Sequence, residues 1–202
     1  MDFKAYSYSC LMAFLPDEIS AKIRAFSLAL PDADIFEPFD EEHGRVKPRE
    51  AHTTVKYGIH TDDPNEMIAL LAEQDMVRLI LKGVTAFDNE DSIVLKVDVE
   101  SEDLSRLNAL VSSGTECTDS YPGYNPHVTI AYLNHHDDEP EYYKKFFCDI
   151  FDGTEVWVDR LKFSTPAGNK YWIGLSGGFG AEIVRAAKMS RIVEAVFKDM
   201  SR

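Results

Sequence analysis

Two short segments repeat one pattern, and that repeat constrains the fold more than any other feature of the chain. Residues 51–57 read Ala-His-Thr-Thr-Val-Lys-Tyr, and residues 126–132 read Pro-His-Val-Thr-Ile-Ala-Tyr. Both segments are rich in β-favouring residues, and each has histidine, then threonine two positions later, then tyrosine at its end. The repeat predicts two equivalent strands in two similar halves.

Side chains alternate across a strand, so each histidine is expected to share a face with the threonine that follows it. Strict alternation gives this face the members His52, Thr54, Lys56, His127, Thr129 and Ala131. It places Tyr57 and Tyr132 on the opposite, more apolar face. Either triplet alone would more simply be a polar pair on a half-exposed strand, but its repetition favours one shared site.

The remaining elements place the two segments at corresponding points of the halves. The first half is predicted as a strand over 6–15, a helix over 16–30, the strand from 52, a helix over 62–71 and a hairpin over 77–99. The second is predicted as a helix over 101–111, the strand from 127, a short helix over 142–147 and a hairpin over 154–175 closed around 166–169. This order predicts a duplicated α+β fold with antiparallel sheets, helices on their outer faces and a central cleft where His52 and His127 meet.

The predicted elements divide the chain into two regions. Residues 1–175 are expected to form the two-lobed body, with the lobes related by a pseudo-twofold axis. Residues 176–202 are expected to form a glycine-rich joint and an extra amphipathic C-terminal helix, which docks on the body or joins a homo-oligomer. The glycines of 174–180 match no phosphate-binding motif and are interpreted as part of a joint.

Charge and composition limit the partners. The net charge of −14 argues against long duplex nucleic acid, because binding a phosphate backbone draws on many Lys and Arg contacts. A small anionic ligand stays compatible, since local positive groups can serve a site that the overall field opposes. No run of 18 apolar residues or leader pattern is present, so we expect a cytoplasmic protein without a membrane partner. The three cysteines, Cys10, Cys117 and Cys148, fit neither a disulfide framework nor a zinc signature.

The paired histidines and threonines suit one kind of chemistry. Histidine gains and loses a proton near neutral pH, so one imidazole can accept a proton from an attacking oxygen at phosphorus while the other protonates the leaving oxygen. The threonine hydroxyls can donate hydrogen bonds to the non-bridging phosphate oxygens. We therefore predict His52, Thr54, His127 and Thr129 as catalytic residues of a phosphodiester-cleaving site.

Three further residues are candidates for substrate binding. Lys56, on the same predicted face as His52, would add a cation. Tyr121 and Tyr124, in the turn-rich loop before His127, can either stack a nucleobase or pack beneath the loop, and the sequence does not separate these alternatives. The other histidines are assigned to loops or linkers. A metal site at His135, His136 and Asp137 is a weak candidate, because adjacent loop residues are more simply solvent-exposed.

These residues resemble the two-histidine (2H) phosphoesterases, a family that includes the bacterial 2′,5′ RNA ligase type, cyclic phosphodiesterases and phage nucleases that degrade cyclic-oligonucleotide signals of bacterial immunity. The resemblance covers about residues 6–175 and rests on the segments from His52 and His127 and on the closing strands around Phe163 and Ile173. It implies a bilobal fold with both histidines as acid and base, both threonines as phosphate ligands, and no metal or other cofactor. The long acidic loop over 31–50 and the C-terminal helix depart from the family pattern, so substrate size does not carry over.

The leading hypothesis is a metal-independent hydrolase of a small cyclic nucleotide, either a 2′,3′-cyclic phosphate or a cyclic oligonucleotide signal with a phage anti-defence role. One alternative is an enzyme that processes RNA ends or 2′,5′ linkages. Another is a non-catalytic protein that binds and sequesters a nucleotide. The presence of all four polar motif residues argues mildly against the last alternative, since a pure binder has less need of two titrating groups.

Overall fold

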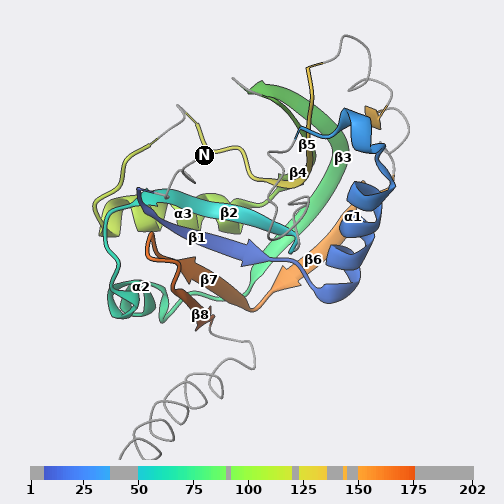
Figure 1. Ribbon diagram of the computed structural model, residues 1–202. Helices are drawn as coiled ribbons and strands as arrows, with labels where there is room; N and C mark the ends of the chain where they lie inside the picture. Colours follow the sequence, from blue (N-terminus) through green and yellow to red (C-terminus); the bar gives the residue numbers. More distant parts are fainter. Residues whose placement is uncertain are drawn as a thin grey trace, which may run out of the picture.

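The computed structural model describes residues 7–36, 50–89, 92–119, 123–135, 143–144 and 150–175. Its elements are β1 (Ser9–Phe14), α1 (Asp17–Ala29), the 3-10 helix η1 (Asp32–Asp34), β2 (His52–Ile59), α2 (Pro64–Leu71), β3 (Val77–Asn89), β4 (Ser92–Glu100), α3 (Glu102–Gly114), β5 (His127–Leu133), β6 (Thr154–Val158), β7 (Arg160–Ser164) and β8 (Lys170–Gly174) (Figure 1). The predicted helix over 181–200 lies outside these residues, as does most of the predicted helix over 142–147.

The described strands form one eight-stranded antiparallel sheet in the order β6-β3-β4-β5-β2-β1-β7-β8. The two histidine strands, β2 and β5, are neighbours at its centre. We call β2, β1, β7 and β8 the β2 lobe, and β5, β4, β3 and β6 the β5 lobe. The predicted α+β class with antiparallel strands is confirmed.

Helices and strands bury a common apolar core. Apolar residues of α1 and α3, such as Ile23, Leu104 and Leu107, pack with strand residues such as Val55 and Ile130, and all five are at most 3% exposed. Figure 1 shows α3 behind β2 and α1 along the β5 lobe, so the core lies on the helix side of the sheet. Ser101 caps the N-terminus of α3, because its hydroxyl accepts a 3.1 Å hydrogen bond from the backbone N–H of Leu104.

The sheet is curled so that its two edges approach each other. Strands β6 and β7 lie six places apart in the strand order, yet Asp159 alone connects them. Consecutive Cα atoms are about 3.8 Å apart, so one residue cannot span an open eight-stranded sheet. The prediction of a single hairpin over 154–175 was therefore wrong in its first part. β6 pairs with β3, and only β7 and β8 form a hairpin.

Beyond their centre, β2 and β5 separate, and a short segment fills each gap. They share one register pair, Thr53 with Val128. The segment after α3 bridges β2 through Ile59 and Cys117, and the segment after α1 bridges β5 through Ile35 and Leu133.

The first bridge needs glycine at position 58. Gly58 has φ of +86°, and a Cβ there would lie 2.0 Å from the carbonyl oxygen of Thr118. A side chain would push the neighbouring segment away, so Gly58 lets the chain before His127 run close against β2.

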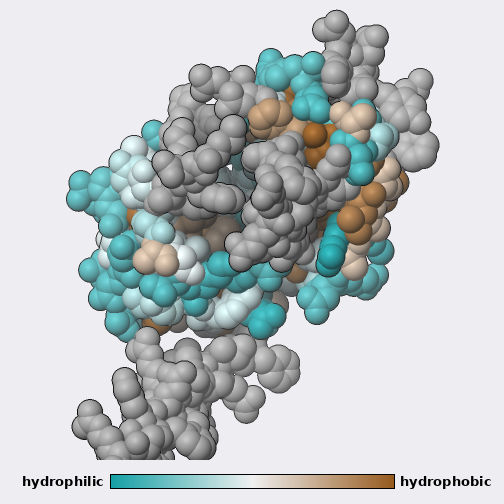
Figure 2. All heavy atoms as spheres, in the orientation of Figure 1, coloured by the Kyte–Doolittle hydropathy of each residue, from teal (hydrophilic) through white to brown (hydrophobic). Residues whose placement is uncertain are grey.

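On the face seen in Figure 2, the coloured surface is largely hydrophilic, and more hydrophobic side chains gather over α1. Leu28 of α1 is 57% exposed, and Ile150 is 48% exposed. No helix among the described residues is both long enough and apolar enough to cross a membrane.

Candidate functional site

The register between β2 and β5 brings the four predicted catalytic residues together. Thr53 is the partner of Val128, and antiparallel strands advance in opposite directions. His52 therefore lies across from Thr129, and Thr54 lies across from His127. The two histidines occupy one diagonal of this arrangement and the two threonines occupy the other. The charge of His127 is also one of the causes that lower the pKa of His52, as expected for rings that share a site.

Each imidazole is held by the backbone in the same way. His52 Nδ1 lies 3.0 Å from the carbonyl oxygen of Glu50, and His127 Nδ1 lies 2.9 Å from the carbonyl oxygen of Asn125. A carbonyl oxygen only accepts, so Nδ1 carries the hydrogen in both rings. This leaves Nε2 of each ring for proton transfer, as an acceptor in the neutral form and a donor in the protonated form.

In the β2 lobe, a lysine and a phenylalanine support His52. The Phe14 ring stacks on His52 with centroids 5.1 Å apart, and Lys162 Nζ lies 3.8 Å from the centroid of the same phenyl ring. Lys162 is 5% exposed and donates a 2.7 Å hydrogen bond to the Glu50 carboxylate. Trp172 lies edge-on to Phe14 at 5.3 Å.

Burial and charge act on the proton affinity of His52. Desolvation lowers its pKa most, the hydrogen bond to the Glu50 carbonyl opposes this, and the positive charge of Lys162 lowers the pKa further. Lys162 likewise holds the pKa of the Glu50 carboxyl below its usual range by donating a hydrogen bond to it. The His52 imidazole is therefore neutral around pH 7, the state in which it can accept a proton.

In the β5 lobe, the same residue types support His127 in a different layout. Phe87 of β3 lies edge-on to His127 with centroids 5.7 Å apart, and Lys96 Nζ lies 5.9 Å from the centroid of Phe87. Lys96 forms an ion pair with Asp98 and donates a 2.8 Å hydrogen bond to the Thr85 hydroxyl. Asp98 is the cross-strand partner of His127, and its carboxylate also accepts a 2.8 Å hydrogen bond from the Thr85 hydroxyl.

Thr53 and Thr54 lie on opposite faces of β2. The Thr54 hydroxyl lies on the histidine face, where the Cys10 thiol contacts it, and burial raises the pKa of that thiol to about 12. Cys10 is thus a neutral packing residue beneath Thr54. The Thr53 hydroxyl is buried on the helix side and has no hydrogen-bond partner among the described residues.

A bulge in each histidine strand corrects the predicted alternation. Val55 and Lys56 of β2 both lie opposite Leu11, and Ile130 and Ala131 of β5 both lie opposite Leu95. Two residues opposite one is the pattern of a β-bulge, whose paired residues point to the same side. All four bulge residues are buried. From the bulge onward, the residues of each strand therefore lie on the opposite face from the one that strict alternation predicts.

The bulge moves Lys56 off the histidine face, so the prediction that it shares a face with His52 was wrong. Lys56 is 3% exposed, and its ammonium lies 2.5 Å from the Asp119 carboxylate. Conversely, Tyr57 and Tyr132, predicted for the apolar face, lie on the histidine face. Tyr132 is accordingly 41% exposed.

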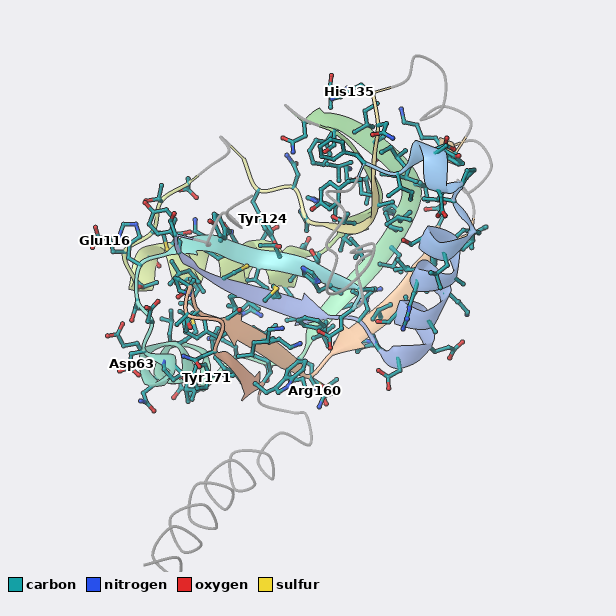
Figure 3. All side chains as sticks on the ribbon, viewed as in Figure 1. Asp63, Glu116, Tyr124, His135, Arg160 and Tyr171 are labelled. Carbon is teal, nitrogen blue, oxygen red and sulfur yellow. The ribbon has the colours of Figure 1, made fainter. Side chains whose placement is uncertain are left out.

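Tyr124 takes the packing alternative among those left open. It packs against the core, and its hydroxyl donates a 2.9 Å hydrogen bond to the carbonyl oxygen of Thr54 (Figure 3). Burial raises its pKa, so the phenol keeps its proton. Tyr124 therefore ties the loop before β5 to β2 at the site. Tyr121 lies outside the described residues.

Four residues around the histidines were not predicted from the sequence: Phe14, Phe87, Lys96 and Lys162. Signals for two of them were present, because Lys96 interrupts the apolar run of β4 and Lys162 stands between Leu161 and Phe163. Neither lysine could be assigned to a histidine without the strand order.

Other parts of the described structure offer no competing centre. No group of three or more His, Cys, Asp or Glu among the described residues is arranged to hold a metal ion. Of the weak metal candidate, His136 and Asp137 lie outside these residues. A surface pocket between α2 and α3, lined by Glu66, Leu70 and Gly114 among others, contains none of the site residues.

Comparison with known proteins identifies a family. The family model described as the 2′-5′ RNA ligase superfamily matches residues 15–170 of the chain. No curated protein matches the chain by sequence.

Several solved structures share the fold. TT0787 of Thermus thermophilus is 20% identical with a TM-score of 0.54, covering 84% of this chain and 95% of that one. E. coli LigT, solved with 3′-AMP, is 16% identical with a TM-score of 0.54 and the same coverage. Usb1 of Kluyveromyces marxianus, solved with uridine monophosphate, is 12% identical with a TM-score of 0.54, covering 85% of this chain and 100% of that one. At these identities the likeness concerns the fold.

Proposed function

Because the chain belongs to the 2′-5′ RNA ligase superfamily of two-histidine phosphoesterases, it is a phosphodiesterase, and we propose that it hydrolyses a small cyclic nucleotide. The substrate is a 2′,3′-cyclic phosphate or a cyclic oligonucleotide, and the catalytic residues are His52, Thr54, His127 and Thr129. The observation that carries the proposal is the register between β2 and β5, which puts two imidazoles and two hydroxyls on four neighbouring positions of one sheet face.

We assign His52 as the general base. Its lowered pKa keeps Nε2 unprotonated near neutral pH, with Nδ1 committed to the Glu50 carbonyl. His52 takes a proton from the attacking oxygen, which is water or a neighbouring ribose 2′-hydroxyl, as that oxygen bonds to phosphorus.

We assign His127 as the general acid. Its Nδ1 is committed to the Asn125 carbonyl, and Nε2 delivers its proton to the ribose oxygen that leaves phosphorus. For a 2′,3′-cyclic phosphate, water adds, one P–O bond to the ribose breaks, and the product is a nucleoside monophosphate. The two histidines end with their protonation states exchanged, and solvent resets them.

The two threonines serve the phosphate itself. Each hydroxyl lies beside one histidine on the strand and across from the other, so both can donate to non-bridging oxygens as charge develops there. This division of roles needs no metal ion, because proton transfer and charge stabilisation both come from side chains.

The test is hydrolysis by the purified full-length protein in EDTA. The substrates are 2′,3′-cyclic mononucleotides, cyclic di- and trinucleotides, linear diribonucleotides and a long RNA, with products identified by chromatography and mass spectrometry. We expect turnover of a cyclic substrate that EDTA leaves unchanged. Inertness toward the whole panel would refute the proposal.

The same panel separates the alternatives. Activity confined to the long RNA, falling steeply with added salt, would indicate RNA processing. Recovery of a stoichiometrically bound cyclic nucleotide in unchanged form would indicate a sequestering protein. A phage anti-defence role rests on the family resemblance and stays a prediction, which cleavage of a cyclic oligonucleotide would support.

A further inference from the structure

The repeat in the histidine strands is longer than three residues. Each reads His-x-Thr-x-x-Tyr-x-x-His, because His60 follows His52 by eight positions and His135 follows His127 by eight. The central part of each repeat forms the proposed catalytic site. The outer Tyr and His of each repeat have no part in the chemistry above.

The outer parts lie at opposite ends of the histidine face. The bulges turn Tyr57 and Tyr132 to this face, and β2 and β5 run in opposite directions from their shared pair. At about 3.3 Å per residue, each tyrosine lies roughly 13 Å along its strand from that pair. Figure 3 shows His135 at one extremity of the molecule and Glu116, the partner of His60, at another.

The Tyr57 end is a fixed aromatic surface. Tyr8 lies edge-on to Tyr57 with centroids 6.2 Å apart and stacks on His60 at 4.9 Å. His60 is held from the other side, because Nε2 lies 2.7 Å from the Thr118 hydroxyl and Nδ1 lies 3.3 Å from the Glu116 carboxylate. Tyr8, Tyr57 and His60 therefore form one cluster of contacting rings at this end of the histidine face.

The Tyr132 end repeats this composition in a more open form. Tyr132 is 41% exposed, and His135 Nδ1 lies 3.6 Å from the Asp88 carboxylate. Thus each end presents a tyrosine ring on the histidine face and, three residues later, a histidine next to a carboxylate. Aromatic rings bind nucleobases by stacking, whatever the base.

We propose that Tyr57 and Tyr132 form two nucleoside subsites, one on each side of the scissile phosphate. The inference rests on the proposed function and narrows it to substrates in which a phosphodiester joins two nucleosides, linear or cyclic. Such a substrate places one base at each end, whereas a 2′,3′-cyclic mononucleotide reaches only one end. His60 and His135 border the two subsites.

The test compares substrates with two nucleosides and a substrate with one nucleoside on tyrosine variants. For a 3′,5′-linked diadenosine monophosphate and for cyclic di-AMP, Tyr57→Ala and Tyr132→Ala should each lower kcat/KM by between about 5-fold and about 150-fold. For 2′,3′-cyclic AMP, only one of the two variants should have such an effect. Tyr57→Phe and Tyr132→Phe keep the ring and should stay within about 2-fold of wild type.

Two controls test whether the effects are specific to the two tyrosines and whether the variants are folded. Trp157 on the edge strand β6 is 49% exposed, so Trp157→Ala removes an exposed aromatic side chain far from the histidines and should not change kcat/KM for any of the three substrates. Thermal melting checks each variant, and if an alanine variant unfolds, the leucine variant replaces it, because leucine keeps apolar bulk and loses the aromatic face.

The outcomes separate this inference from the proposed function. If the dinucleotides are hydrolysed but either alanine variant stays within about 2-fold of wild type on them, the two-subsite inference fails and the phosphodiesterase assignment stands. If nothing is hydrolysed, calorimetric binding of the diadenosine monophosphate decides. Weaker binding in both alanine variants then supports the subsites, and equal or undetectable binding overturns them.

Discussion

The β2 lobe and the β5 lobe place the same residue types around their histidines but take them from different strands. In the β2 lobe the phenylalanine comes from the adjacent strand β1 and the lysine from β7, one strand further out. In the β5 lobe the lysine comes from the adjacent strand β4 and the phenylalanine from β3, one strand further out. Cation and ring have exchanged strands between the lobes.

Some features of the site are common to the two lobes, and others differ between them. Both lobes share the His-x-Thr spacing, the bulge after threonine and the backbone carbonyl at Nδ1. The supporting residues differ in position, and with them the charge beside each ring: a buried lysine acts on His52, and an aspartate is the cross-strand partner of His127. The two lobes thus share their strand geometry and differ in the groups around their histidines, and the proposed roles of base and acid depend on this difference.

The largest loss of activity is expected from removing a histidine, and it should be similar in the two lobes. Removing either imidazole, by His52→Ala or His127→Ala, should lower kcat by about 10²- to 10⁴-fold, because acid and base are both needed in each turnover. Steady-state kinetics on the best substrate of the panel, with circular dichroism to check the fold, measures this. A variant that keeps near-normal activity would show that its lobe contributes no proton transfer.

A slightly smaller effect is expected at the threonines. Thr54→Val and Thr129→Val remove a hydroxyl aimed at the phosphate and should each lower kcat by about 10²-fold. The chain offers a matched control one residue away. Thr53→Val removes a hydroxyl that is buried on the helix side and has no hydrogen-bond partner in the part of the chain that the structure describes, so activity should not change and the melting temperature should stay equal or rise.

The comparison of Thr53→Val with Thr54→Val can also contradict the assigned site. If Thr53→Val lowers activity as much as Thr54→Val, the two hydroxyls do not differ by face, and the register between β2 and β5 would not explain the site. The second strand already has valine at the position equivalent to Thr53, namely Val128, which is fully buried.

The sequence predicted the parts of the site that depend on spacing along one strand. His52, Thr54, His127 and Thr129 follow from the repeat and share one face, as alternation requires. Alternation failed beyond the threonines, because a bulge depends on how many residues the neighbouring strand supplies opposite it. This is why Lys56 and the two tyrosines were placed on the wrong faces.

Strand order was the second limit. Lys162 reaches Phe14 and His52 only because β7 lies beside β1, and no local pattern reports that pairing across about 150 residues. Likewise, β6 is one edge strand of the sheet and β7 lies next to the other edge strand, although a single residue connects them and the segment reads as a continuous hairpin. Local periodicity predicts elements well, while pairings between distant elements depend on how the whole core closes.

The smallest expected effect tests the influence of the Lys162 charge on the pKa of His52. Lys162→Met keeps the length of a buried side chain and removes the positive charge that lowers the pKa of His52. It also frees the Glu50 carboxylate, whose negative charge raises that pKa, so both changes act in the same direction. His127 also acts on His52, and the substitution leaves it unchanged.

A base must be unprotonated, so a higher pKa of His52 moves the acidic limb of the kcat/KM profile to higher pH in Lys162→Met. Activity should fall a few-fold on the acidic side and stay unchanged on the plateau above it. Lys82→Met, which removes an exposed lysine paired with Glu100, is the control of equal charge and should leave the profile in place. If instead the alkaline limb moves in Lys162→Met, His52 acts as the acid, and the roles of the two lobes are the reverse of those assigned here.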